Sequence, residues 1–382
     1  MLSKVTGPDT RLQERRTEIW FLIGQLPVGG TERTLLDLAR NLDQSRYAVT
    51  IWTIKDEGRL IKEVSEFVDY RSLKASGKSD VLAPLRFIRE VRKQQPDIIQ
   101  SFLYYDNLLA RFSGLTTQNA SIITGVRAIP EEPPLLRRVS ERYTFGLSDL
   151  IVSNSQAGME YVIARGANPE KVEVIRNGRQ ISKFVSGSAS ERVCQQLQID
   201  GDLPVVGTVG RLVRRKGHLD LLNAWPLVLN AYPDAQLLFV GDGPEREGFE
   251  AKATELGCRE SVTFAGHRDD VPDMLDLMDV FVFPSHFEGL PGALIEAMIA
   301  ELPIVATPVD GSAELIDDGV TGMFVPPRNS EEISRRVTDM LDDADMRENL
   351  GTAASEYARK EFALENMVAK FEKLYDDLLS PD

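Results

Sequence analysis

Cysteine and histidine are scarce in this chain of 382 residues. The two cysteines, Cys194 and Cys258, show no motif spacing. This excludes a disulfide framework and favours reduced thiols in a cytoplasmic protein. The three histidines, His218, His267 and His286, are too scattered to predict a metal cluster, so no metal site is expected.

Long apolar runs and two familiar phosphate-binding patterns are also missing. No run approaches the ~18 residues that a membrane span requires, and no secretory signal is visible at the N-terminus. Residues 1–16 are polar and aperiodic, which predicts a flexible tail. The patterns G-x-G-x-x-G and G-x-x-x-x-G-K-[ST] are absent, so neither a nicotinamide-dinucleotide enzyme nor a P-loop nucleotidase is expected.

Negative charge dominates, but it is unevenly distributed. Residues 1–180 carry a net charge of +4, whereas the remainder carries −19. Solubility is the ordinary explanation. The alternative is that the first half faces something anionic, either a membrane surface or a phosphorylated acceptor. No dense run of Lys and Arg has interleaved aromatic residues, so nucleic acid is not expected as a partner.

Short apolar runs alternate with helical patterns along the whole chain. Strands that are apolar throughout and separated by helices of about 10–15 residues are typical of parallel sheets covered on both faces. Two such series flank the polar segment 177–190, which predicts an α/β fold with two doubly wound, Rossmann-like domains. The expected strands are 18–24, 47–54, 67–70, 97–102, 120–124, 149–153 and 172–175, then 203–210, 235–241, 262–266, 279–284, 303–307 and 322–326.

Two glutamates, eight residues apart, stand out in the stretch 285–307 (SHFEGLPGALIEAMIAELPIVAT). Glu288 is predicted in the loop after a strand, and Glu296 about two turns into the next helix, which Pro291 is expected to begin. Carboxylates accept hydrogen bonds from vicinal hydroxyls, and a helix N-terminus offers free N–H groups to an anion. The stretch therefore suits a ligand with two polyols joined through an anion. The alternative is that both glutamates are ordinary surface residues.

Two further loops at predicted strand ends suit an anion. In GRLVRRKG (210–217), Arg211 and Lys216 flank a turn at a helix start, which favours a diphosphate. The alternative there is a solvated basic loop. After the first strand, Gly29 and Gly30 bring bare backbone to another helix start. Many such turns carry glycine for its geometry alone.

Taken together, these motifs resemble those of retaining glycosyltransferases of family 4, which have the GT-B fold. The resemblance spans roughly residues 18–380. It implies a cleft between the two sheets, with an acceptor-side domain at 17–180, a nucleotide-sugar domain at 181–360 and a C-terminal helix in 361–382 that crosses back to the first domain. The matching segments are QLPVGGTE (25–32), VIRNG (174–178), VGRLVRRKG (209–217), VGDGPE (240–245), FAGHRDDVPDML (264–275), PSHFEGLPGALIEAMIAELPIVAT (284–307) and GSAELIDDGVTGMFVPP (311–327).

The resemblance implies transfer of a sugar from a nucleotide-diphosphate donor with retention of the anomeric configuration. Arg211 and Lys216 would hold the diphosphate. Glu288 would contact the donor sugar, and Glu296 would bind the ribose hydroxyls. No cofactor and no metal ion are expected.

Other positions are assigned by the same resemblance. Arg268 would lie near the base, and Gly29 and Gly30 would close on the phosphate from the other domain. Many family members have a histidine directed at the donor sugar where this chain has Arg127, and none precedes His218. The backbone expected along sugar and phosphate is that of Gly289, Leu290, Pro291 and Gly292.

The acceptor is expected to be a glycan or a lipid-linked molecule in surface polysaccharide biosynthesis. Arg137, Arg138 and Arg142 in one predicted helix fit a peripheral contact with an anionic membrane at its cytoplasmic face, although a solvated helix face explains them too. Two alternatives stay open. One is another GT-B enzyme, such as an epimerase or a phosphorylase, whose usual catalytic histidine or cofactor lysine is not recognisable here. The other is a non-catalytic sugar-nucleotide-binding subunit that acts through a partner.

Overall fold

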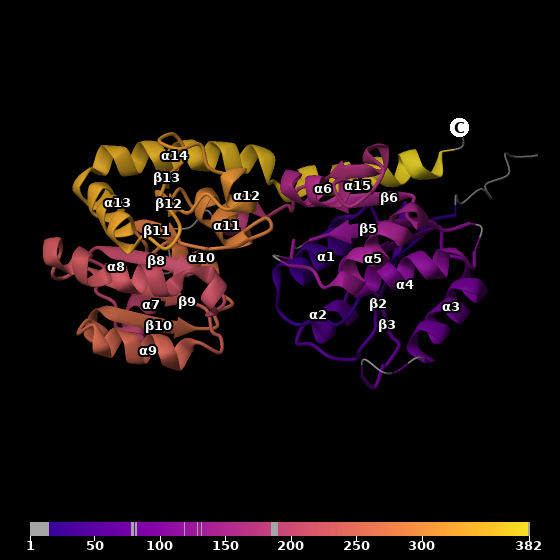
Figure 1. The fold of residues 1–382 in the computed structure, drawn as a ribbon, viewed down its shortest axis with the longest axis horizontal. Helices are drawn as coiled ribbons and strands as arrows, with labels where there is room; N and C mark the ends of the chain where they lie inside the picture. Colours follow the sequence, from indigo (N-terminus) through magenta and orange to yellow (C-terminus); the bar gives the residue numbers. More distant parts are fainter. Residues whose placement is uncertain are drawn as a thin grey trace, which may run out of the picture.

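The chain folds into two lobes that lie side by side (Figure 1). The computed structural model describes residues 15–77, 80, 82–117, 119–127, 129–130, 132–184 and 190–380. Almost all of the predicted tail and part of the predicted linker lie outside this range. Each lobe is built on one parallel sheet, which confirms the predicted GT-B architecture of two doubly wound domains.

The N-terminal sheet has the strand order β3-β2-β1-β4-β5-β6-β7, and all its pairs are parallel. The order reverses between β1 and β4, which is the point where doubly wound sheets open a ligand crevice. All seven strands predicted in this half are confirmed. They are β1 (Thr17–Ile23), β2 (Tyr47–Thr53), β3 (Asp69–Ser72), β4 (Ile98–Ser101), β5 (Ser121–Val126), β6 (Leu150–Ser153) and β7 (Val172–Val174).

The C-terminal sheet has the strand order β10-β9-β8-β11-β12-β13, again with parallel pairs. Its reversal lies between β8 and β11. The six strands predicted here are also confirmed: β8 (Val205–Val209), β9 (Gln236–Val240), β10 (Val262–Gly266), β11 (Val280–Phe283), β12 (Ile304–Ala306) and β13 (Met323–Phe324).

Helices cover both faces of each sheet, because the strands between them are apolar on both sides. The first lobe contains α1 (Gly30–Asn41), α2 (Ile61–Ser65), α3 (Leu82–Gln94), α4 (Tyr104–Gly114), α5 (Leu135–Thr144) and α6 (Gln156–Ile163). The second contains α7 (Ser190–Leu197), α8 (His218–Ala231), α9 (Arg246–Glu255), α10 (Val271–Leu275), α11 (Gly292–Ile299), α12 (Asp310–Ala313), α13 (Ser330–Asp342) and α14 (Ala344–Glu361).

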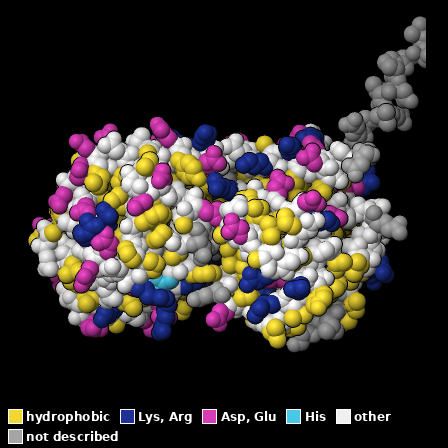
Figure 2. All heavy atoms as spheres, turned by 45° about the horizontal axis from the view of Figure 1, so that its top comes forward, with side chains coloured by type: hydrophobic (Ala, Val, Ile, Leu, Met, Phe, Trp, Pro, Cys, Tyr) yellow, Lys and Arg dark blue, Asp and Glu magenta, His cyan; other side chains and the backbone are white. Residues whose placement is uncertain are grey.

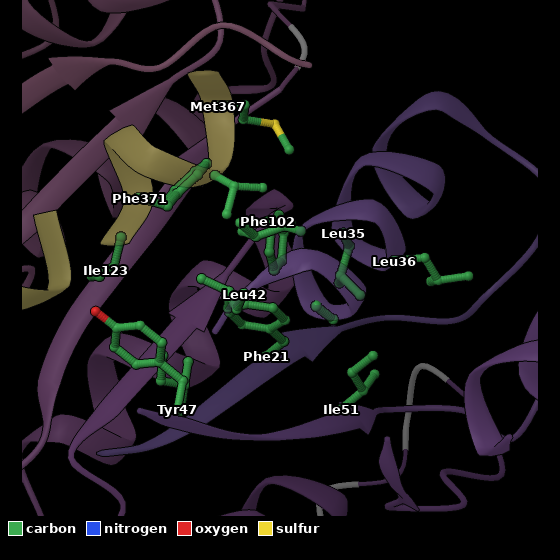
Figure 3. Packing of buried hydrophobic residues seen from close by; sticks show 14 of the residues in the cluster. Phe21, Leu35, Leu36, Leu42, Tyr47, Ile51, Phe102, Ile123, Met367 and Phe371 are labelled. Atoms are coloured by element: carbon green, nitrogen blue, oxygen red, sulfur yellow. The ribbon is translucent and has the colours of Figure 1, made fainter. Parts of the chain in front are cut away.

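The last helix, α15 (Leu364–Leu379), packs on the N-terminal sheet (Figure 3). Met367 and Phe371 join a buried cluster with Phe21 of β1. The hydroxyl of Tyr375 donates a 2.6 Å hydrogen bond to Gln100 of β4. The chain therefore passes between the lobes a second time just before α15.

The two crossing segments are hydrogen-bonded to each other. The backbone N–H of Arg179 donates to the Phe362 carbonyl at 2.7 Å, and that of Leu364 donates to the Arg179 carbonyl at 2.9 Å. Arg179 thus lies in the hinge where both connections between the lobes meet.

Helix α11 ends in a left-handed residue that is not glycine. Glu301 has φ +62°, and the N–H of Leu302 bonds back to the Ala297 carbonyl at 3.2 Å, as in a Schellman cap. This conformation costs a residue with a side chain roughly 1–2 kcal/mol. The other end of α11 differs by one residue from the prediction, because Pro291 is extended (φ −78°, ψ 105°) and the helix begins at Gly292.

Glu301→Gly is expected to raise the free energy of unfolding by about 1 kcal/mol, because glycine relieves the left-handed strain. The exposed ion pair between Glu301 and Arg359, at 3.1 Å, contributes little. Urea unfolding would measure the change. Glu301→Ala is the control, because it removes the ion pair and keeps the strain. Equal stability of the glycine and alanine variants would contradict this explanation.

Candidate functional site

Two loops meet at the strand reversal of the C-terminal sheet, one after β8 (210–217) and one after β11 (284–291). The N–H of His286 donates to the Arg215 carbonyl at 2.8 Å. Gly217 has φ +65°, and a Cβ on it would come within 1.8 Å of the Pro284 carbonyl oxygen. Only glycine permits this approach, so the two loops are held in direct contact.

Lys216 and Glu288 form an ion pair across these loops. The Lys216 ammonium contacts Oε1 of Glu288, and the Ser285 hydroxyl donates to the same oxygen at 3.2 Å. Both charged side chains are largely buried, with 16% and 10% exposed. A buried ion pair adds little net stability because desolvation offsets the attraction. Its position at a strand reversal therefore indicates function rather than folding.

The other residues of the β8 loop divide into exposed and buried groups. Arg211 is exposed and has no ion-pair partner among the described residues. His218 lies beneath the loop, where burial, assisted by the Lys216 charge, lowers its pKa to about 3. Its ring packs edge-on against Phe239 and Phe249. His218 is therefore a neutral core residue at physiological pH.

Glu296 is already engaged by a residue that the sequence did not single out. Nε of Arg179 donates to Oε1 of Glu296 at 2.8 Å, and Nη1 donates to the Gly178 carbonyl at 3.0 Å. The guanidinium lies over the start of α11, since a Cβ on Gly292 would come within 2.2 Å of it. The hinge is thus tied directly to the expected ribose-binding carboxylate.

Gly289, Leu290, Pro291 and Gly292 run from the Glu288 loop into α11. Leu290 and Pro291 are buried, whereas the two glycines are partly exposed. This segment connects the Lys216–Glu288 pair to the Glu296–Arg179 pair. The structure therefore brings seven of the predicted positions, with Lys216 and Glu296 at the two ends, into one continuous region around the β11–α11 turn.

Two other predicted residues, Arg268 and Arg127, are engaged elsewhere. Arg268 pairs with Asp270 through two hydrogen bonds of 2.7 and 2.5 Å. Arg127 donates to Asn177 of the hinge at 2.6 Å. No described contact joins either arginine to Lys216, Glu288 or Glu296.

The Gly29-Gly30 turn is occupied by an acidic side chain. The Glu32 carboxylate folds back over it, so that a Cβ on Gly29 would come within 2.3 Å of Glu32 Oε2. Burial raises the pKa of Glu32. An anion at this turn would therefore have to displace or share the place of Glu32, which the sequence pattern did not reveal.

Across the described ranges, no group of three or more His, Cys, Asp or Glu side chains could hold a metal ion. Among the helices of those ranges, none is long and apolar enough to cross a membrane.

Comparison with known proteins gives matches for both halves. Residues 28–183 match the family Glycosyltransferase Family 4, and residues 190–357 match Glycosyl transferases group 1. A D-inositol 3-phosphate glycosyltransferase of Corynebacterium kroppenstedtii is 28% identical over 69% of this chain, although the match spans only 60% of that protein. The capsular polysaccharide biosynthesis glycosyltransferase CapM of Staphylococcus aureus is 25% identical over 79% of this chain and 82% of its own length.

The fold of this chain is similar to that of solved glycosyltransferase structures. The crystal structure of Anabaena HepE in complex with UDP-glucose superposes with a TM-score of 0.84, covers 95% of this chain and 100% of the Anabaena chain, and is 21% identical.

Proposed function

The chain belongs to glycosyltransferase family 4, and we propose that it transfers a sugar from a nucleotide-diphosphate donor to a glycan or lipid-linked acceptor, with retention of anomeric configuration. The observation that carries this proposal is the Lys216–Glu288 pair at the strand reversal, continuous with Glu296 on α11. The similarity to CapM and to the UDP-glucose complex of HepE supports a nucleotide sugar as donor and a polysaccharide or glycoconjugate as product.

Lys216 and Arg211 are the groups proposed to hold the diphosphate. Their positive charge would stabilise the negative charge that develops as the nucleotide leaves, and no metal ion or cofactor is invoked. Glu288 would then contact the donor sugar, while the backbone N–H groups of Gly289–Gly292 would lie along sugar and phosphate.

Glu296 is proposed to bind the ribose hydroxyls while Arg179 holds its other face. Arg268 is proposed to lie near the base. From the first domain, the Gly29-Gly30 turn and Arg127 would approach the donor. Positioning of two substrates in one cleft would supply most of the remaining rate enhancement.

The function is tested by transfer assays with uridine, guanosine and adenosine diphosphate sugars in the presence of EDTA. We expect transfer from one class of donor, and NMR should show the same anomeric configuration of the sugar in the donor and in the product. Inversion of configuration, or a requirement for metal, would contradict it. Donor binding without turnover for any acceptor would instead favour a non-catalytic sugar-nucleotide-binding subunit.

We also propose that helix α5 contacts an anionic membrane. Its inner face is polar: Arg137 pairs with Glu141 at 2.7 Å, and Ser140 bonds Tyr104 at 2.7 Å. Its outer face is apolar and is flanked by the exposed Arg138 and Arg142. The exposed apolar residues are Leu135 (72%), Leu136 (79%), Val139 (44%) and Tyr143 (78%).

Basic residues beside an outward apolar stripe suit an interfacial helix on anionic lipid. Exposed apolar side chains on neighbouring helices of the same lobe extend this surface: Leu82 and Leu85 on α3, and Tyr105 and Phe112 on α4. Figure 2 shows hydrophobic and basic side chains together along the lower edge of the right-hand lobe.

The double substitution Leu136→Glu and Tyr143→Glu is expected to reduce binding to phosphatidylglycerol-containing vesicles by at least about tenfold, since each apolar side chain that enters lipid contributes roughly 1.5–3 kcal/mol. Vesicle sedimentation would measure it. Leu227→Glu, at a 44% exposed position in the other lobe, is the control. The proposed membrane contact would be refuted if wild-type protein did not bind anionic vesicles, or if the double variant bound them as strongly as wild type.

A further inference from the structure

A pocket lies in the N-terminal lobe, at the carboxyl ends of β4 and β5 and beneath α4 and α5. Its cavity volume is about 80 Å³, several times the ~10–15 Å³ that one water molecule needs. None of its lining residues belongs to the two loops that hold Lys216 and Glu288. The lining side chains that matter here are Phe102, Tyr104, Arg111, Arg127, Arg137 and Glu141.

Arg127 is the unusual member of this lining. Its side chain is buried, with 7% of the residue exposed, and Nη1 donates to the Asn177 amide oxygen at 2.6 Å. Among the residues that the structure describes, the buried Nε and Nη2 have no hydrogen-bond partner. A buried cation with two unmatched donors is costly unless a ligand completes its hydrogen bonds. Burial lowers the pKa of Arg127 to about 10, so the group remains cationic at neutral pH.

The other charges of the pocket do not neutralise Arg127. Arg137 is paired with Glu141 at 2.7 Å, which cancels one cation. Among the described residues, Arg111 donates to three hydroxyl oxygens and to no carboxylate: those of Ser148 (2.9 Å), Thr144 (3.1 Å) and Thr124 (3.1 Å). Three guanidinium groups therefore face one carboxylate, and the pocket is electropositive as well as incompletely hydrogen-bonded.

We infer that this pocket binds an anionic group of the acceptor, a phosphate or carboxylate, through Nε and Nη2 of Arg127. Two adjacent guanidinium N–H groups match two oxygens of either anion. The inference rests on the proposed function in one respect, namely that the bound anion belongs to the sugar acceptor. Since Arg137 lines the pocket from the inner face of α5, a phosphate on a lipid at the outer face would lie close to the site.

Binding of glycerol 3-phosphate, with glycerol as the uncharged comparison, tests the pocket by calorimetry. Wild-type protein should bind glycerol 3-phosphate and not glycerol. Arg127→Met should weaken binding at least tenfold, with Arg127→Lys intermediate because it keeps the charge and loses the paired geometry. Arg137→Met, which leaves Arg127 in place, should weaken binding less. Arg92→Met, at an exposed position on α3, should have no effect.

The same variants are then tested with vesicles containing phosphatidic acid. If wild type binds glycerol 3-phosphate and Arg127→Met does not, a soluble phosphate is sufficient for binding. If wild type binds only the vesicles, and Arg127→Met does not bind them, the ligand is a lipid phosphate. Binding of neither probe, or equal binding by wild type and a folded Arg127→Met variant, would overturn the inference. Nucleotide-sugar binding by the wild-type protein separates the two proposals: if wild type binds a nucleotide sugar but neither phosphate probe, the donor site stands and the anion pocket fails.

Discussion

Replacing Lys216 by methionine is expected to lower kcat by about 10²–10³-fold, the loss that follows removal of one group aimed at developing negative charge. Methionine keeps most of the side-chain length and removes the ammonium that pairs with Glu288. The rate of sugar transfer at saturating donor measures the effect. Arg214→Met is the matched control, because Arg214 lies in the same loop but its side chain is 88% exposed and pairs with Glu245, which is outside the proposed site.

The loss must be separated from damage to the fold. Lys216→Met leaves the mostly buried Glu288 carboxylate with the Ser285 hydroxyl but without its cation, so some stability should be lost. Adding Glu288→Gln removes the carboxylate charge that faces Lys216 in the wild type and should recover stability without recovering activity. Activity within about threefold of wild type in a folded Lys216→Met protein would remove Lys216 from the diphosphate site.

Phe371→Ala is expected to destabilise the N-terminal lobe by about 3–5 kcal/mol. Phe371 is fully buried among residues of the N-terminal core, although it lies near the C-terminus of the chain. Leu379→Ala, at a 37% exposed position in the same helix, should change stability by less than about 0.5 kcal/mol.

The chain's three tryptophans allow each lobe to be followed alone. Trp20 and Trp52 lie in the N-terminal core and Trp225 in the C-terminal core. Fluorescence unfolding in a Trp225→Phe background therefore reports the first lobe. Phe371→Ala should move the midpoint of this unfolding transition to a lower denaturant concentration. If it moved only the Trp225 signal, measured in a Trp20→Phe, Trp52→Phe background, α15 would belong to the C-terminal lobe instead.

The strands could be predicted because they are short, apolar on both faces and regularly spaced. Glu288 and Glu296 could be placed in a loop and on the following helix, because a strand end and a helix start are local signals. The pairing of Arg179 with Glu296 could not be predicted from the sequence, because 117 residues separate them and the folded hinge brings them together.

The orientation of α5 and the position of the Glu32 side chain could not be predicted from the sequence either, because both depend on tertiary packing. Helical periodicity normally points apolar residues inward, but α5 turns its ionic residues toward the lobe, where Glu141 and Arg137 pair. The basic residues of this helix were visible in the sequence, whereas the direction of its apolar face was not. Likewise, Gly29 and Gly30 predicted bare backbone, and the Glu32 side chain that covers it follows from tertiary packing.

The most direct test of the donor site is a thermal-shift screen of nucleotide sugars against wild type, Glu296→Ala and Glu331→Ala. Glu331, exposed in the first turn of α13, provides a matched control outside the site. A ligand at a hundred times its dissociation constant stabilises the fold by about 2.7 kcal/mol. We expect such a shift with one class of nucleotide sugar in wild type and Glu331→Ala, and its loss in Glu296→Ala. An equal shift in all three proteins would show that the donor binds without Glu296 and would contradict the site described above.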